Sequence, residues 1–339
     1  MTSLSTARTN TRAAKVLSQV LGEAGIGVAL VALAAFFLAA APHFATTGNF
    51  RDIMTQITLN TMLAVGMTFV ILVGGIDLSV GSVIALCAVV AGKAMENGGS
   101  SALPFAIGLS VLIGAICGLI SGFVTERWRV PSFIVTLGML YVARGAAEQY
   151  TDARTIYNLP AALTSFGTAT VVGIPAVFAV ALSMVAVAWF VLSRTVFGRL
   201  VYATGNNEEA VRLSGHRTNL IKIVCFVIGG LCVGLAAVIY MARLGVASPI
   251  LGQGYELNAI AAVVIGGASL SGGRGSVIGT LLGACLLGVL TNGLLLMGVS
   301  DFQRTMVTGT VIIIAVILDA YRKQLMTRLS GAAESRLLP

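Results

Sequence analysis

The sequence predicts an all-α fold, a polytopic membrane helix bundle of about ten transmembrane helices with two parallel internal repeats. Of the 339 residues, 57% are hydrophobic and only 10% are charged, whereas soluble chains carry roughly 25% charged residues. Long stretches carry no charge, and one glycine-rich segment occurs twice. The composition therefore excludes an ordinary soluble protein, and it also excludes a disordered, fibrous or disulfide-bonded chain.

The charge-free stretches define the expected membrane spans. A helix needs about 20 mostly apolar residues to cross a bilayer, and uncharged runs of roughly that length recur along the chain. The third, fifth and eighth of these spans are short or interrupted by glycine. The predicted spans are 24–42, 53–73, 80–95, 103–125, 131–147, 173–193, 223–242, 258–271, 277–297 and 304–321.

The distribution of lysine and arginine predicts the orientation of the chain. Ten crossings place both termini on one side, and basic residues accumulate in cytoplasmic loops. Fifteen of the 21 basic residues fall in segments that are cytoplasmic if both termini are. The net charge of +8 then needs no nucleic-acid partner. The expected organisation is a cytoplasmic segment 1–23, a transmembrane domain 24–322 with a cytoplasmic loop at 194–222, and a cytoplasmic tail 323–339.

No metal centre or disulfide framework is expected. The five cysteines lie inside apolar runs, none has C-x-x-C spacing, and the chain has only two histidines. Such thiols usually act as small buried hydrophobic groups. They are Cys87, Cys117, Cys225, Cys232 and Cys285.

Two segments of the chain repeat one another. Residues 74–79 read G-G-I-D-L-S and residues 266–271 read G-G-A-S-L-S, and G-S-V-I follows each copy. The copies lie six spans apart, so the repeats are expected to run parallel, which is a plan found in transporters. Asp77, Ser79 and Ser271 could cap helices, and Asp77 could instead form an ion pair within the loop, serve conformational coupling, or bind a proton or cation. The motif residues are Gly74, Gly75, Asp77, Ser79, Gly266, Gly267, Ser269 and Ser271.

A short helix is predicted within the polar segment 194–222. Gly205 signals a helix start, Asn207 is a suitable N-cap, and Glu208 lies in the first turn, where the helix dipole favours a carboxylate. Gly215 then ends the helix. Because so short a helix is not stable alone, it docks either on its own bundle or lipid, or on a separate cytoplasmic subunit. The candidate residues are Gly205, Asn207, Glu208, Ala210, Leu213 and Gly215.

Four stretches together resemble the permease subunit of bacterial ABC importers for monosaccharides, the ribose-type branch. They are residues 73–82, 130–137, 198–215 and 252–275, and the resemblance covers about residues 25 to 322. It implies a chain of the bacterial inner membrane that forms a translocation path and is not an enzyme.

The resemblance also implies a division of labour among subunits. A separate cytoplasmic ABC ATPase would bind ATP, so no cofactor is expected in this chain, which has no G-x-x-x-x-G-K-[ST] motif. A periplasmic sugar-binding protein would deliver the monosaccharide. A second permease copy or close relative would complete the membrane part. The helix near 207–214 would be the coupling helix, seated in a cleft of the ATPase.

Candidates for the substrate path are polar or aromatic side chains in or near the spans. Monosaccharides are uncharged and hydroxylated, so their transport needs polar groups in a mostly apolar lining. Ordinary packing between membrane helices uses small polar side chains as well. Long external segments are expected at about 148–172 and 243–257. The path candidates are Asn60, Thr136, Tyr255 and Asn258.

Three other functions are compatible with the composition. A permease of the same superfamily could carry a nucleoside or a branched-chain amino acid. A proton- or sodium-coupled carrier would more often place charges deep in its spans, and the middle of most spans here carries none. A membrane-embedded enzyme is disfavoured because the chain has no H-E-x-x-H or G-x-S-x-G motif.

Overall fold

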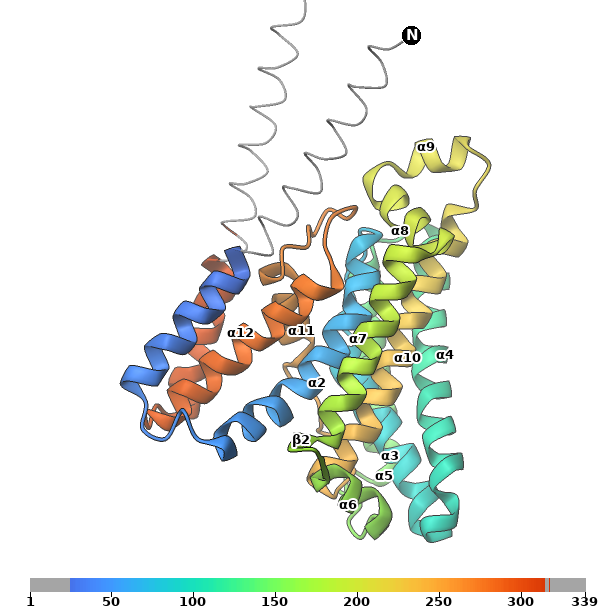
Figure 1. Ribbon diagram of the computed structural model, residues 1–339. Coiled ribbons are helices and arrows are strands. Elements are labelled where there is room, and N and C mark those ends of the chain that lie inside the picture. The colour runs from blue at the N-terminus through green and yellow to red at the C-terminus, as the bar shows by residue number, and fades with distance from the viewer. Residues whose placement is uncertain (1–24, 315–316, 318–339) are drawn as a thin grey trace, which may run out of the picture.

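The structure is a computed structural model, and it describes residues 25–314 and residue 317. Over these residues the chain is a helix bundle with one small antiparallel hairpin (Figure 1). The expected segments 1–23 and 323–339, and with them the side of the membrane on which the termini lie, fall outside the described residues.

Helices follow one another along most of the described chain. The first runs over Gly25–Ala40, and the last begins at residue 301 and is described to residue 314. Between them lie α2 (Thr47–Leu72), α3 (Val80–Gly98), the 3-10 helix η1 (Gly99–Ala102), α4 (Leu103–Trp128), α5 (Ser132–Thr151), α6 (Ala161–Thr168), β1 (Thr170–Val171), β2 (Ile174–Pro175), α7 (Ala176–Arg194), α8 (Val196–Asn206), α9 (Glu208–Leu213), α10 (Thr218–Leu244), α11 (Tyr255–Ile265) and α12 (Val277–Leu296).

A helix lies at each of the ten predicted spans. In the described part of the chain, five helical stretches are long and apolar enough to cross a membrane, and Gly25–Ala40 and α11 are apolar but shorter. The polytopic all-α class is therefore confirmed, and the number of crossings stays a prediction. The five long stretches are Thr47–Leu72, Gly99–Trp128, Ala176–Arg194, Thr218–Leu244 and Val277–Leu296.

The eighth predicted span, 258–271, is wrong in its bounds. Its helix, α11, has 11 residues and ends at Ile265. Gly267, with φ +86°, then turns the chain out of the helical conformation. At 1.5 Å per residue, α11 is about 16 Å long, roughly half the thickness of the bilayer core.

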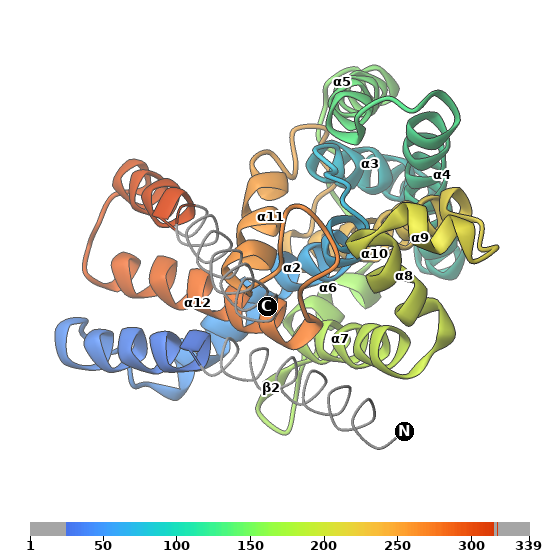
Figure 2. The ribbon, with the colours of Figure 1, turned by 90° about the horizontal axis from the view of Figure 1, so that it is seen from above.

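Helices α2 and α10 form the centre of the bundle. In its most apolar 18-residue window, α2 is 83% buried and α10 is 61% buried, whereas the corresponding windows of α4 and α7 are only 28% and 33% buried. Seen from above, α3, α4, α7, α11 and α12 surround these central helices (Figure 2). The outer helices therefore turn apolar surface outward, as helices do that face lipid or another membrane subunit.

Helix α10 packs most closely on α4, and glycines make the approach possible. A Cβ on Gly114 would overlap the Gly230 carbonyl oxygen, and one on Gly118 would overlap the Phe226 carbonyl oxygen. Small residues at such positions let membrane helices come into backbone contact. We infer that α4 and α10 behave as one rigid pair.

Two non-helical segments are packed inside the bundle. The first, residues 73–79, links α2 to α3, and its Asp77 is only 4% exposed. The second, residues 245–254, links α10 to α11, and its Ala247 is fully buried and pairs with Ile156. Segment 245–254 is thus packed against the bundle through Ile156 and the Arg144 side chain of α5, and its expected place on the external side of the membrane stays a prediction.

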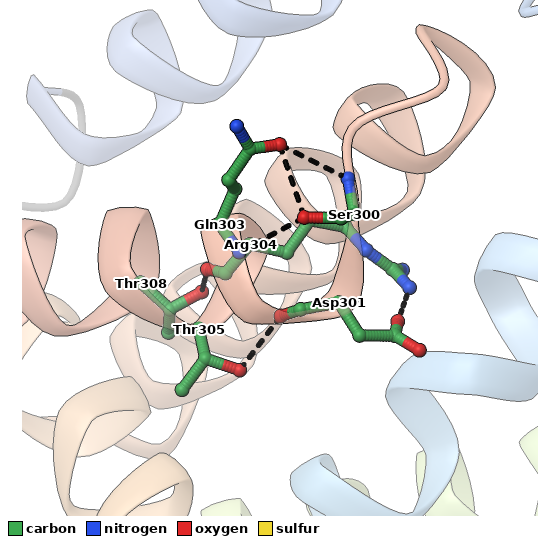
Figure 3. A network of polar contacts seen from close by, with 6 residues as sticks. All are labelled: Ser300, Asp301, Gln303, Arg304, Thr305 and Thr308. Carbon is green, nitrogen blue, oxygen red and sulfur yellow. Dashed lines mark hydrogen bonds and ion pairs between the residues drawn. The ribbon is translucent and has the colours of Figure 1, made fainter.

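A capping box begins the last helix. The Ser300 amide and hydroxyl both donate to Gln303 Oε1, and the Gln303 amide donates to Ser300 Oγ (Figure 3). Asp301 forms an ion pair with Arg304 one turn on. This S-x-x-Q arrangement satisfies amides that a helix start leaves unpaired. It places the start at residue 301, three residues before the predicted span.

The cysteines are reduced and lie away from solvent. Four of the five are buried, Cys285 is partly buried, and none is in a disulfide. Within the described residues, no cluster of three or more histidine, cysteine, aspartate or glutamate side chains could hold a metal ion.

Candidate functional site

The predicted short helix is α9, and it lies at the upper end of the bundle in Figure 1. Asn207 occupies the N-cap, and its Oδ1 accepts from the Ala210 amide at 3.0 Å. Gly215 follows the helix with φ +85°. Val211 faces inward and is 7% exposed, whereas Leu213 is 79% exposed. A helix of six residues thus places an apolar side chain outward, where the described chain does not cover it.

A second helix, α8, immediately precedes α9 and was not predicted from the sequence. Its N-cap is Thr195, whose Oγ1 accepts from the Gly198 amide at 3.1 Å. Gly205 was expected to signal a helix start, and it lies instead near the end of α8. A Cβ on Gly205 would overlap the Leu72 carbonyl oxygen, so glycine is needed there for contact rather than for a turn.

Two loops that contain the motifs, residues 73–79 and 266–276 (the repeat loops), lie against each other beside α8. The Gly273 amide donates to the Leu72 carbonyl at 2.8 Å. The Asn206 side chain donates to the Gly273 carbonyl at 3.1 Å, and the Tyr202 hydroxyl donates to the Gly275 carbonyl at 2.9 Å. The Gly75 amide of the first motif donates to the Val70 carbonyl of α2 at 2.9 Å, so the end of α2, both repeat loops and α8 form one continuous hydrogen-bonded region next to α9.

The first motif is fixed by its own side chains and by α5. Asp77 Oδ1 accepts from the Ser79 amide at 2.8 Å and from the Ser79 hydroxyl at 2.6 Å. Ser132 Oγ accepts from the Ile76 amide at 2.9 Å, and Thr136 Oγ1 accepts from the Leu78 amide at 3.1 Å. Burial raises the pKa of Asp77 above its usual range, and the two bonds from Ser79 oppose this rise.

The predicted caps are only partly as expected. Ser79 stands at the N-cap of α3, but its hydroxyl is used by Asp77 and makes no capping bond. Helix α12 is capped by Ser276, whose Oγ accepts from the Gly279 amide at 2.9 Å, and not by Ser271. The two-residue insertion in the second motif accounts for this, because it moves the helix start to the G-S-V-I sequence.

The second motif forms a tight turn. The Ser269 amide donates to the Arg274 carbonyl at 2.9 Å, and the Gly272 amide donates to the Ser269 carbonyl at 2.9 Å. A Cβ on Gly266 would meet the Gly279 carbonyl oxygen at 2.5 Å. In the first motif the turn lies at the start, where Gly74 has φ +80° and its amide donates to the Ile71 carbonyl at 2.9 Å.

A cavity of about 580 Å³ opens between α9, the first motif and the ends of α4 and α10. Its lining combines three carboxylates and three basic groups with motif glycines Gly74 and Gly75. Lys222 joins two of the carboxylates, since its Nζ lies 2.6 Å from Glu208 Oε2 and 3.3 Å from Glu126 Oε1. The charged side chains of the lining are Glu126, Arg129, Glu208, Glu209, Arg212 and Lys222.

The four substrate-path candidates lie on three helices. Asn60 on α2 and Tyr255 and Asn258 on α11 belong to helices that pack together. Asn60 Oδ1 is buried and has no hydrogen-bond partner among the described residues. Tyr255 packs edge-to-face on Tyr240, with ring centroids 5.8 Å apart. Thr136 is fully buried and bonded to the first motif. Contact of any of them with substrate stays a prediction.

The roles of two charged side chains, Lys222 and Arg144, were not predicted from the sequence because their partners are distant along the chain. Lys222 pairs with Glu126, which is 96 positions earlier. Arg144 on α5 donates from NH1 to the carbonyls of Pro249 and Leu251, the second at 2.9 Å. A lone charge inside a predicted span was a signal that could have drawn attention to Arg144.

Comparisons with known proteins agree with this architecture. The chain matches the family described as "Branched-chain amino acid transport system / permease component" over residues 49–316. The ribose import permease protein of Escherichia coli (strain K12) is 42% identical over 296 residues, which are 86% of this chain and 92% of that protein.

Further relatives extend the match. The ribose import permease protein of Bacillus subtilis (strain 168) is 40% identical over 280 residues, covering 82% of this chain and 86% of the relative. The D-allose transport system permease protein of Escherichia coli (strain K12) is 37% identical over 291 residues, covering 86% and 89%. No solved structure matches the chain. The chain therefore belongs to this family of membrane permease components.

Proposed function

We propose that the chain is the permease subunit of an ATP-driven ABC importer that carries a ribose-like monosaccharide across the bacterial inner membrane, with both termini in the cytoplasm. The observation that carries the proposal is the 42% identity to a ribose import permease over 86% of the chain. The D-allose permease relative favours the same substrate class. The family description names branched-chain amino acids, so such a solute, or a nucleoside, is the second candidate.

In this proposal α9 is the contact with a separate cytoplasmic ATPase, which binds the ATP. Support comes from two exposed apolar residues of α9, Ala210 and Leu213, the second of which is 79% exposed. The buried Val211 packs the same helix against the bundle. A partner groove would cover this apolar side, as in other helix-in-groove contacts.

Closure of the ATPase would move α9 and, through α8, the two repeat loops. The support is the run of bonds from Tyr202 and Asn206 to the second motif, and from Gly273 to Leu72. At the opposite end of the bundle in Figure 1, α6 and the β1–β2 hairpin would face the periplasm and a sugar-binding protein. A second permease, identical or related, would cover part of the outward apolar surface.

The direct test is uptake of labelled monosaccharides, nucleosides and branched-chain amino acids. Vesicles would carry this chain with its ATPase and binding protein, and a parallel set would carry a catalytically dead ATPase. We expect uptake of one pentose or hexose that disappears with the dead ATPase. Uptake that survives the dead ATPase and stops when the ion gradient is removed would overturn the proposal in favour of a secondary carrier.

The docking role of α9 is tested by Ala210→Glu. A carboxylate placed in an apolar groove is poorly solvated, so we expect the ATPase to separate from the permease and uptake to stop, while membrane insertion stays normal. The control is Ala162→Glu on α6, another exposed alanine, at the opposite end of the bundle. Co-purification of the ATPase is the readout, and normal co-purification with Ala210→Glu would contradict the docking role.

A further inference from the structure

The Lys222 side chain connects three helices at the face that carries α9. It lies in the second turn of α10, and only 19% of it is exposed. Its ammonium group contacts Glu208 Oε2 at 2.6 Å, on the first residue of α9, and Glu126 Oε1 at 3.3 Å, in the last turn of α4. Glu126 is 10% exposed, so this pair is shielded from water far more than an ordinary surface pair.

Helix α9 has few other attachments to the transmembrane bundle. It is six residues long, and Val211 is its only buried side chain. Its carboxylates at 208 and 209 lie in the first turn, where the helix dipole stabilises negative charge. The Glu208–Lys222 contact therefore joins the N-terminal end of α9 to a basic side chain of α10.

Helices α4 and α10, which carry Glu126 and Lys222, form a rigid pair. Glycines bring α4 and α10 into backbone contact along Gly114, Gly118 and Gly122. A displacement of α9 that is passed to Lys222 and Glu126 thus acts on two packed helices together. Because the backbones of α4 and α10 are in contact, no side chain between them is needed to pass the displacement from one helix to the other.

We propose that Lys222 is a positioning residue that transmits movement from α9 to the α4–α10 pair, with Glu208 and Glu126 as its two contacts. This inference rests on the proposed function, since α9 moves only if an ATPase drives it. Removal of the ammonium group would leave α9 docked on the ATPase but poorly connected to the helices that open the path.

The alternative is that the ion pairs merely stabilise the fold. The two roles differ in what they affect. A stabilising role lowers the amount of assembled complex, and uptake per ATP hydrolysed stays constant. A transmitting role lowers uptake per ATP hydrolysed in complex that is fully assembled.

The experiment measures uptake and ATP hydrolysis in the same vesicles, normalised to assembled complex. For Lys222→Met we expect normal co-purification of the ATPase and a roughly tenfold fall in uptake per ATP, within the usual range of coupling between sites. Lys222→Arg keeps the charge and should restore most of the coupling. The matched control is Lys93→Met, which removes another lysine–glutamate pair, with Glu96, that is 46% exposed on α3.

A second variant keeps the test decisive if Lys222→Met does not assemble. Glu208→Gln leaves the shielded Lys222–Glu126 pair intact and should lower uptake per ATP without loss of complex. Unchanged uptake per ATP in Glu208→Gln and Lys222→Met, or equal defects in Lys222→Arg and Lys222→Met, would overturn the inference. Failure of the proposed function itself is recognised separately, because wild-type uptake would then persist with a dead ATPase.

Discussion

The two non-helical segments inside the bundle, 73–79 and 245–254, are both fastened to α5, but by different chemistry. The first accepts and donates hydrogen bonds with the hydroxyls of Ser132 and Thr136. The second is bound through its carbonyls by the guanidinium group of Arg144. Backbone groups released from a helix in apolar surroundings must be satisfied by side chains. Bonds from a charged group are the stronger ones, so we expect 73–79 to rearrange more readily than 245–254.

The largest effect is expected for Arg144→Met, which tests whether segment 245–254 depends on its charged donor. The variant removes two charge-assisted bonds, each worth about 1.5–3 kcal/mol, and leaves the carbonyls of Pro249 and Leu251 without that donor. We expect a loss of about 3 kcal/mol or more in the stability of the folded chain, measured by thermal unfolding in detergent. The control is Gly145→Ala, the adjacent residue, where a Cβ meets nothing within 4 Å. An unfolding temperature equal to that of the wild type would contradict the role given to Arg144.

The next test acts where the second segment meets α3. A Cβ on Gly81 would overlap the Gly252 carbonyl oxygen and Glu256 Oε2. Gly81→Ala should therefore push segment 245–254 away from α3, at a cost of about 1–3 kcal/mol, as is typical of overpacking. Gly138→Ala, in the interior of α5 with open space around it, serves as the matched glycine control. Equal unfolding temperatures for the two variants would show that the contact is loose.

The smallest effect is expected at the hydroxyl-bound segment. Thr136→Val keeps the shape of the side chain but removes the acceptor for the Leu78 amide and the donor to the Ile76 carbonyl. A buried group left unpaired costs about 1–3 kcal/mol, so the loss should be below that of Arg144→Met. Thr136→Ser, which keeps the hydroxyl, should unfold close to the wild type. A loss with Thr136→Val larger than with Arg144→Met would reverse the comparison.

Features that depend on neighbouring residues were predictable from the sequence. The hydrophobic runs predicted where helices lie, and Asn207 and Gly215 predicted both ends of α9. Features that depend on distant residues were not. Gly205 is explained by the Leu72 carbonyl and Lys222 by Glu126, and neither partner can be inferred from local pattern. The burial of segment 245–254 could not be inferred either, because its hydropathy does not reveal that Arg144 of α5 binds the carbonyls of Pro249 and Leu251.

The low exposure of the cysteines has a practical consequence. A thiol reagent that acts from water meets four cysteines that are buried and one, Cys285, that is partly buried. One cysteine introduced at the exposed Leu213 would then be the preferred attachment point for a fluorophore or spin label. The wild-type chain thus provides a nearly silent background on which the motion of α9 can be followed during a transport cycle.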